Sequence, residues 1–368
     1  MIASAVSMAV VSTVALAEKP TFEANDDLMN VHNRCIIQFN DNVDGSKVTG
    51  LARAMAAKGN TSIKHVYKNS VKGFTANMPC NAAEKAFGND ANILRMTPDS
   101  IVSVNFKGKP GGGDGGQQAS YGTARVGGPV DGTGRTAWVI DSGIDLDHPD
   151  LNIDASRGFT SISSGGMDDA NGHGTHVAGT IGALNNNIGA LGVAPNTTVI
   201  PVRVLDRRGS GSISGVIAGV DHVAANASSG DCANMSLGGG VNTTLDDAVK
   251  SAAQSSGAYF VIAAGNSSRD ANNESPARAN GNRVFTISSM DSNDNFSSFS
   301  NYGSSVDYAA PGSGIFSLWK NGGTNTISGT SMASPHACAV IMMRNGNPGT
   351  DGTVNGDPDG NPDPIIHL

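Results

Sequence analysis

The sequence predicts an α/β protein in which a parallel β-sheet carries helices on both faces, preceded by a small α+β module. Over residues 121–345, short apolar runs typical of buried parallel strands alternate with segments whose apolar residues recur at helical spacing. The chain holds 48 glycines but only 5% aromatic residues, which favours a tightly turned α/β protein over a disordered one. Residues 18–107 follow a pattern of their own, so we expect two folded units.

The first segment, residues 1–17, carries no charged side chain and ends in Ala15-Leu16-Ala17. Small residues at the first and third positions of such a tripeptide are typical of a secretory cleavage site. The apolar run is short and is interrupted by serines, which is less than a membrane-spanning helix needs. We therefore expect a signal peptide at residues 1–17 and a secreted, extracellular or periplasmic mature protein with no membrane span.

Residues 18–107 contain strand-like and helix-like runs in the order β-α-β-β-α-β. In chain order, the predicted strands and helices are Cys35–Phe39, Ser46–Ala57, Ile63–Tyr67, Gly73–Met78, Ala82–Phe87 and Ile101–Val104.

Two segments have the composition of connections rather than of a core. Residues 108–120 are rich in glycine, which indicates a flexible linker and a site open to proteolysis. Residues 346–368 are rich in Gly, Pro and Asp, and acidic residues alternate from Asp357 to Asp363. This composition favours a disordered acidic tail.

Three motifs that lie far apart in the sequence contain an acid, a base and a nucleophile. Asp141 ends the apolar run 136–140, and open α/β sheets place their sites at the carboxyl ends of such strands. His173 lies in the motif Asn-Gly-His-Gly-Thr-His at residues 171–176. Ser331 precedes an apolar run that we expect to be helical, and a helix N-terminus supplies free N–H groups and positive potential.

The chemistry of these three side chains is complementary. A serine hydroxyl becomes an effective nucleophile at neutral pH only beside a base. An imidazole, whose ordinary pKa is about 6.5, can take the serine proton and return it to a leaving amine. A carboxylate can hold the imidazole in the required tautomer without taking the proton. We therefore assign Ser331 as the nucleophile, His173 as the base and Asp141 as the acid that orients it.

The order Asp, His, Ser differs from the order in chymotrypsin-type proteases and in α/β-hydrolases. The three motifs resemble those of the subtilisin-like serine proteases, particularly the proteinase K-like branch, over residues 121–344. The resemblance implies a serine endopeptidase made as a self-processing zymogen. Residues 18–107 then resemble the family's ferredoxin-like inhibitory propeptide, which would be removed by cleavage within residues 108–120.

The same resemblance implies the rest of the site. The Asn266 side chain and the Ser331 backbone N–H would form the oxyanion hole. Two short segments would pair with an extended peptide, and two small-residue walls would form the pocket for the P1 residue, which precedes the scissile bond. Because these walls lack a buried charge, we expect broad specificity with an apolar or aromatic P1 residue. The substrate-binding residues are Gly209, Ser210, Gly211, Ser236, Leu237, Gly238, Ala263, Ala264 and Gly265.

No cofactor is required for this chemistry, but metal binding has to be considered. His176 lies one helical turn after His173, and we expect a packed, hydrogen-bonded histidine rather than a metal ligand. Members of the resembled family commonly bind structural calcium, but no complete loop with defined ligand spacing is present here. The acidic residues around the first two motifs are Asp145, Asp147, Asp150, Asp168 and Asp169.

Each half of the chain holds two of the four cysteines, Cys35 with Cys80 and Cys232 with Cys338. In an exported protein each pair could close a disulfide. Buried free thiols are the alternative, and the sequence leaves both open.

The charge distribution limits the partners. Residues 118–368 carry 12 basic and 22 acidic side chains, within a net charge of −8 for the whole chain. An acidic catalytic part argues against nucleic acid as a partner. We expect polypeptide substrates, the chain's own prosegment as intramolecular inhibitor, and a monomer.

Two other functions fit the sequence. One is a non-catalytic binding protein with a protease fold that stays bound to its prosegment, and its support is the departure of residues 346–368 from the family. Loss of about the first hundred residues, seen by mass spectrometry, would distinguish the enzyme from this alternative. The other is an esterase or acyl transferase with the same triad, which a comparison of peptide and ester substrates would separate.

Overall fold

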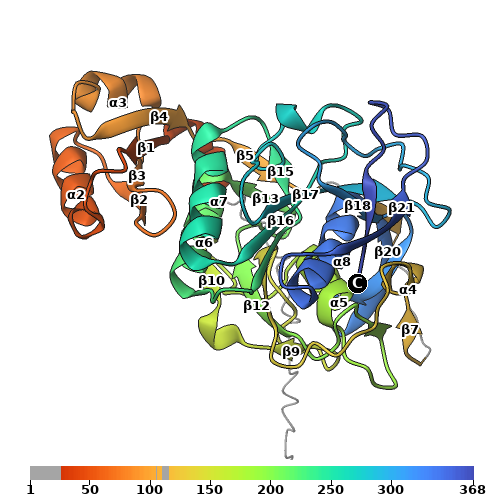
Figure 1. Ribbon diagram of the computed structural model, residues 1–368. Helices are drawn as coiled ribbons and strands as arrows, with labels where there is room; N and C mark the ends of the chain where they lie inside the picture. Colours follow the sequence, from red (N-terminus) through yellow and green to blue (C-terminus); the bar gives the residue numbers. More distant parts are fainter. Residues whose placement is uncertain (1–25, 105, 110–115) are drawn as a thin grey trace, which may run out of the picture.

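The computed structural model describes residues 26–104, 106–109 and 116–368, so the predicted signal peptide lies outside the described residues. Its centre is the expected sheet, with strand order β10-β12-β8-β14-β16-β17-β18-β22-β21 and β9 beside β12 (Figure 1). Neighbouring strands on this path are parallel except β21 and β22. The strands are β8 (Thr136–Asp141), β9 (Asn152–Ile153), β10 (Phe159–Thr160), β12 (Thr198–Arg203), β14 (Cys232–Met235), β16 (Tyr259–Ala263), β17 (Val284–Met290), β18 (Tyr308–Pro311), β21 (Gly349–Thr353) and β22 (Pro364–His367).

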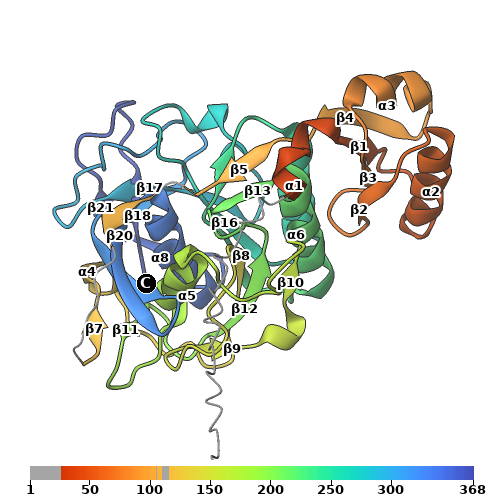
Figure 2. The ribbon, with the colours of Figure 1, turned by 180° about the vertical axis from the view of Figure 1, so that it is seen from behind.

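Side chains alternate between the two faces of this sheet, and helices cover each face (Figures 1 and 2). Trp138 and Ile140 of β8 pack in one core with α6 and α7, whereas Ala137 and Val139 pack in a second core with α5 and α8. The predicted fold class is therefore confirmed. The helices are α5 (His173–Gly182), α6 (Ile213–Asn226), α7 (Thr243–Ser256) and α8 (Thr330–Met343), with the short α1 (Asp26–Met29) and α4 (Tyr121–Arg125) elsewhere.

The N-terminal module forms a separate four-stranded antiparallel sheet in the order β2-β3-β1-β4. The last predicted strand of the module exists as β5 (Ile101–Ser103), but it does not complete this sheet, because the fourth strand is β4, which was not predicted. The side chains of β4 are half-buried or exposed on both faces, so its sequence lacks the apolar alternation that would reveal a strand. The elements are β1 (Cys35–Phe39), α2 (Val48–Lys58), β2 (Ile63–Tyr67), β3 (Gly73–Ala76), α3 (Cys80–Phe87) and β4 (Ile93–Pro98).

The module lies beside α6 and α7 and is held there by buried polar contacts (Figure 1). Asp221 of α6 accepts hydrogen bonds from the three backbone N–H groups of residues 68–70 at 2.7–3.0 Å. Asp99 accepts a bond from the Ser214 N–H at 2.9 Å, and the Tyr67 hydroxyl donates to the Ser214 carbonyl at 3.0 Å. Carboxylates that accept several N–H groups make strong, directional contacts, so the docking is specific.

The tail was predicted to be disordered, and this prediction was wrong. β22 extends the main sheet beside β18, where Ile365 and Ile366 are 1% and 0% exposed. The acidic turn before it is held by its own carboxylates, since Asp359 accepts the Asn361 N–H at 2.7 Å. The tail therefore buries apolar side chains that its overall composition conceals.

Both cysteine pairs form disulfides, Cys35 with Cys80 and Cys232 with Cys338. The second joins β14 to α8 across 106 residues of sequence, with Cα atoms 5.9 Å apart. It therefore links two elements that both carry parts of the site.

In the part of the chain that the structure describes, no helix has the length and apolarity needed to cross a membrane.

The role of the tail can be tested by removing one apolar contact. In a Ser331→Ala background, Ile366→Ala should lower the free energy of unfolding by about 2–5 kcal/mol, because it leaves a cavity in the second core. Thr350→Ala on the exposed face of β21 is the matched control and should change stability by less than about 0.5 kcal/mol. Thermal unfolding measures both, and equal melting temperatures would show that the tail does not contribute to the core.

Candidate active site

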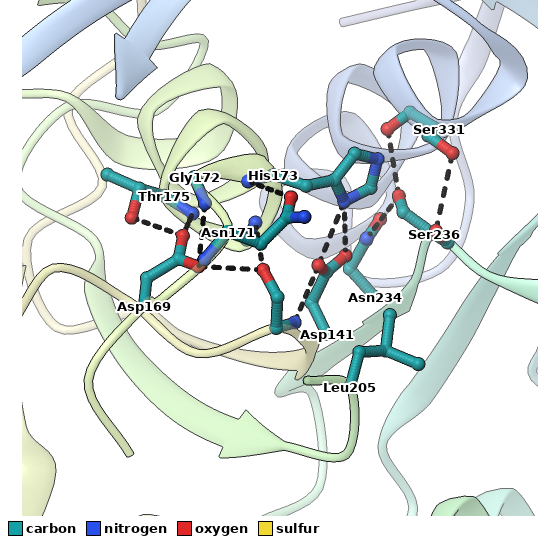
Figure 3. Close-up of polar contacts among 12 residues, drawn as sticks. Asp141, Asp169, Asn171, Gly172, His173, Thr175, Leu205, Asn234, Ser236 and Ser331 are labelled. Atoms are coloured by element: carbon teal, nitrogen blue, oxygen red, sulfur yellow. Dashed lines mark hydrogen bonds and ion pairs between the residues drawn. The ribbon is translucent and has the colours of Figure 1, made fainter. Parts of the chain in front are cut away.

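Asp141 and His173, both fully buried, meet at the carboxyl end of β8 (Figure 3). The Nδ1 atom of His173 lies 2.8 Å from Oδ1 and 2.9 Å from Oδ2 of Asp141. Gly174 makes this approach possible, because a Cβ there would overlap the Gly143 carbonyl and lie 3.2 Å from the Asp141 Cβ. The small residues at the start of α5 thus let the imidazole reach the carboxylate.

A second carboxylate holds the first turn of α5 in place (Figure 3). Asp169 accepts hydrogen bonds from the backbone N–H groups of Asn171, Gly172 and Thr175 at 2.8–2.9 Å. It also accepts one from the Ser142 hydroxyl at 2.8 Å. Sequence analysis considered Asp169 only as a possible calcium ligand. Its place four residues before the predicted helix could have identified it, because a carboxylate there can accept hydrogen bonds from the free N–H groups of the first helical turn.

Ser331 lies in the first turn of α8, and Figure 3 shows this residue beside the His173 ring. The Ser331 Oγ donates to the Ser236 carbonyl at 3.3 Å, and the Ser236 hydroxyl donates to the Ser331 carbonyl at 2.8 Å. Among the described residues, none is hydrogen-bonded to the Nε2 atom of His173. The expected bond from Ser331 to His173 is therefore not formed here, since the Ser331 hydroxyl is bonded to the Ser236 carbonyl instead. Such bonds often tighten only when substrate binds.

Asn234 and Ser334, which the sequence did not single out, fix this end of α8 together with Ser236. Asn234 of β14 donates to the Ser236 hydroxyl at 2.8 Å and accepts a bond from the Ser334 hydroxyl at 2.8 Å. All three side chains are fully buried. This network, together with the nearby disulfide, holds Ser331 over the carboxyl end of β14. No local sequence pattern predicts this network, because Asn234 and Ser334 lie 100 residues apart in the sequence.

Asn266 follows β16, and its side chain is oriented by the residue before the proposed nucleophile. The Asn266 Oδ1 atom accepts hydrogen bonds from the Thr330 N–H at 2.8 Å and the Thr330 hydroxyl at 3.0 Å. Because its oxygen is held by Thr330, the direction of its amide group is fixed. Asn266 and Ser331 line the same pocket, which is the arrangement that an oxyanion hole requires.

The segments expected to bind substrate already hold an extended strand of this chain. β5 (Ile101–Ser103) lies between β13 (Ser210–Ser212) and β15 (Gly238–Gly239) and is antiparallel to both. Val104 continues this pairing, since its N–H donates to the Gly209 carbonyl at 3.0 Å. These segments therefore pair with β5 through their backbones, and their binding of substrate stays a prediction.

After Val104 the chain passes the ring of His173. The Phe106 ring lies 5.3 Å from the ring of His173 and 6.0 Å from that of Trp319. Beyond it, β6 (Lys107–Lys109) pairs with β20 (Gly323–Ser328), which forms a hairpin with β19 (Ile315–Trp319). Part of the predicted linker, residues 110–115, lies outside the described residues; after it, β7 (Gln118–Ala119) pairs with β11 (Ala190–Leu191).

The two predicted pocket walls line a common pocket. Its lining includes Leu237 and Gly238 on one wall and Ala263 and Gly265 on the other, together with Glu274. Glu274 is 7% exposed, so the premise that the walls lack a buried charge was wrong. This residue lies eight positions after Asn266 in a loop without a recognisable motif, and only the folded chain brings it to the pocket.

His176 is the packed histidine that we expected. Its Nε2 atom lies 3.0 Å from the Ile315 carbonyl, and burial lowers the pKa of its ring to about 3. The ring therefore stays neutral at neutral pH. Asp150, one of the carboxylates considered for calcium, accepts a hydrogen bond from the Ala190 N–H at 2.9 Å. Within the described ranges, no group of three His, Cys, Asp or Glu side chains could hold a metal ion, so we assign no calcium ligands.

An Asp-His pair, a serine at a helix N-terminus and a pair of segments that hold an extended strand are the parts expected of a serine hydrolase site. The model of the Subtilase family matches residues 132–351. The chain belongs to this family, as the sequence motifs indicated.

Several characterised relatives support the assignment. The chain is 45% identical over 296 residues to alkaline serine exoprotease A of Vibrio alginolyticus, covering 76% of this chain and 53% of that protein. It is 38% identical over 331 residues to the subtilisin-like serine protease AsES of Sarocladium strictum, covering 81% of each. A solved cold adapted subtilisin-like serine proteinase matches 68% of this chain and 98% of its own, with 42% identity and a TM-score of 0.61. The chain thus spans about half the length of the Vibrio relative.

The role of Asp141 can be tested without changing the shape of the site. Asp141→Asn should lower kcat by about 10⁴-fold, because the amide no longer holds the imidazole in the productive tautomer. Asp145→Asn, at a carboxylate that contacts neither His173 nor Ser331, is the control. Steady-state hydrolysis of a peptide p-nitroanilide by both variants measures the effect, and a loss under tenfold for Asp141→Asn would contradict the assigned role.

Proposed function

We propose that this chain is a secreted serine endopeptidase of broad specificity, made as a self-processing zymogen. Ser331 attacks the scissile carbonyl while His173 takes its proton and returns it to the leaving amine. Asp141 orients His173, and the Asn266 amide and the Ser331 N–H stabilise the oxyanion. The observation that supports this best is β5, a strand of the chain itself that lies between β13 and β15 as a substrate would.

The same segment suggests how the zymogen matures. The N-terminal module would be the intramolecular inhibitor, and the first cut would fall between Val104 and Phe106. Val104 is paired with the cleft on one side, and Phe106 packs against His173 on the other. Cleavage within residues 108–120, as the sequence analysis predicted, would then be a later trimming of the new N-terminus.

Of the two alternative functions, the non-catalytic binding protein loses support and the esterase needs a test. The non-catalytic binding protein rested on the departure of the tail from the family, but the tail completes the main sheet through β22. An esterase would need no extended strand site, whereas β13 and β15 offer one to a peptide backbone. Export, suggested by residues 1–17, agrees with a relative named the extracellular serine proteinase of a Thermus strain, 49% identical over 215 residues.

A serine-directed phosphonate tests the activity directly. The purified protein should be labelled on Ser331 and should lose its hydrolysis of casein and of peptide anilides in proportion to the labelling. Ser331→Ala is the matched control and should be neither labelled nor active. Hydrolysis of simple esters without hydrolysis of peptides would favour the esterase, and an unlabelled, inactive protein would remove the proposal.

Processing can be followed by mass spectrometry and N-terminal sequencing of material held for increasing times. Active protein should yield a first fragment that ends between Val104 and Phe106, because the triad faces that part of the chain. Ser331→Ala should remain uncut in the same medium. A first cut within residues 108–120 would show instead that the cleft holds this strand only as an inhibitor.

A further inference from the structure

We propose that Glu274 makes the P1 pocket selective for a basic side chain, lysine or arginine, over an apolar one of the same length. This inference rests on the proposed peptidase function and specifies its substrate class. Glu274 lines the pocket together with Leu237, Gly238, Ala263 and Gly265. It is a carboxylate in a place where the sequence led us to expect small apolar walls.

The position of Glu274 is fixed by the backbone around it. The Glu274 N–H donates to the Ala271 carbonyl at 3.1 Å. The next residue, Ser275, exchanges two backbone hydrogen bonds with Gly239 of β15, at 3.0 and 3.2 Å. The loop that carries the carboxylate is thus attached to the strand that pairs with substrate, so a bound peptide and Glu274 share one rigid frame.

The two oxygens of this carboxylate have different surroundings. Oε1 accepts hydrogen bonds from Nε and Nη2 of Arg269 at 2.9 and 2.8 Å, and the Arg269 side chain is half exposed. Oε2 lies against Gly265, where a Cβ would overlap it, and 3.5 Å from the place of a Cβ on Gly238. Gly265, with φ +106°, can adopt this backbone and approach Glu274 because it has no side chain. Oε2 is therefore directed to the pocket side of the residue.

The chemistry of the pocket then favours a particular P1 side chain. An apolar tip would cover a carboxylate oxygen and remove its water without offering a hydrogen bond, which is costly for a charged group. A lysine or arginine has an apolar stem that can lie along Leu237 and Ala263, and a cationic end that can bond to Oε2. Arg269 competes for the same carboxylate from outside, so it should moderate this preference rather than abolish it.

Two peptide p-nitroanilides that differ only at P1, lysine against its uncharged isostere norleucine, isolate the effect of the charge. The mature wild-type enzyme should cleave the lysine peptide with the higher kcat/KM. Glu274→Gln should lower the lysine-to-norleucine ratio by about tenfold, the size expected for one charged hydrogen bond. Arg269→Gln should raise this ratio, because the carboxylate loses its competing cation. Arg278→Gln, at an exposed arginine of the same loop that pairs with Asp246 instead, is the matched control and should leave the ratio unchanged.

The outcomes separate this inference from the function on which it rests. If wild type cleaves neither peptide, nor any other, the proposed peptidase function fails and the inference with it. If wild type cleaves both but the ratio is the same in Glu274→Gln, only the assignment of Glu274 is overturned. If Glu274→Gln cannot be obtained folded, Arg269→Gln decides, because a ratio equal to that of wild type would also overturn the assignment.

Discussion

The bond between the buried carboxylate of Asp141 and the ring of His173 is the interaction on which the site depends. A carboxylate without exposure to water must be satisfied by hydrogen bonds, and here the partners come from the imidazole and the Ser142 N–H. Since Asp141 ends β8 and His173 begins α5, the bond fixes this helix to the sheet. Asp169 then satisfies the free N–H groups of the same turn, so the ring has little freedom to turn away.

The nucleophile is positioned by an equivalent arrangement one strand along. Asn234 on β14 and Ser236, just after this strand, hold the first turns of α8 through buried hydrogen bonds, and Cys232 is joined covalently to the same helix. Two helix N-termini therefore meet above adjacent parallel strands. The side chains of the triad come from distant parts of the sequence, yet each is fixed to a rigid element rather than to a mobile loop.

The sequence alone predicts the layered fold and points to three residues that the structure places at one site, because both the fold and these residues have recognisable local patterns. Asp141, His173 and Ser331 each stand in a motif of small residues, and the apolar runs repeat at strand and helix spacing. The errors have a common physical origin. β4 is half-buried on both faces, Ile365 and Ile366 lie in an acidic segment, and Glu274 reaches the pocket only through tertiary contacts. In each case the burial of the residue depends on contacts with residues far away in the sequence. A short stretch of sequence therefore cannot reveal it.

The N-terminal module and the cleft strand act as two linked binding units. Asp221 and Asp99 hold the module on α6, while β5 occupies the substrate site through backbone hydrogen bonds. A bound module keeps the cleft strand at a high effective concentration, so this strand need not bind tightly by itself. Backbone pairing that would be weak for a free peptide thus becomes strong for β5, because β5 is tethered to the docked module; in the proposed zymogen this would make the strand an effective inhibitor. Inhibition would then end when the module is removed, without any change in the cleft itself.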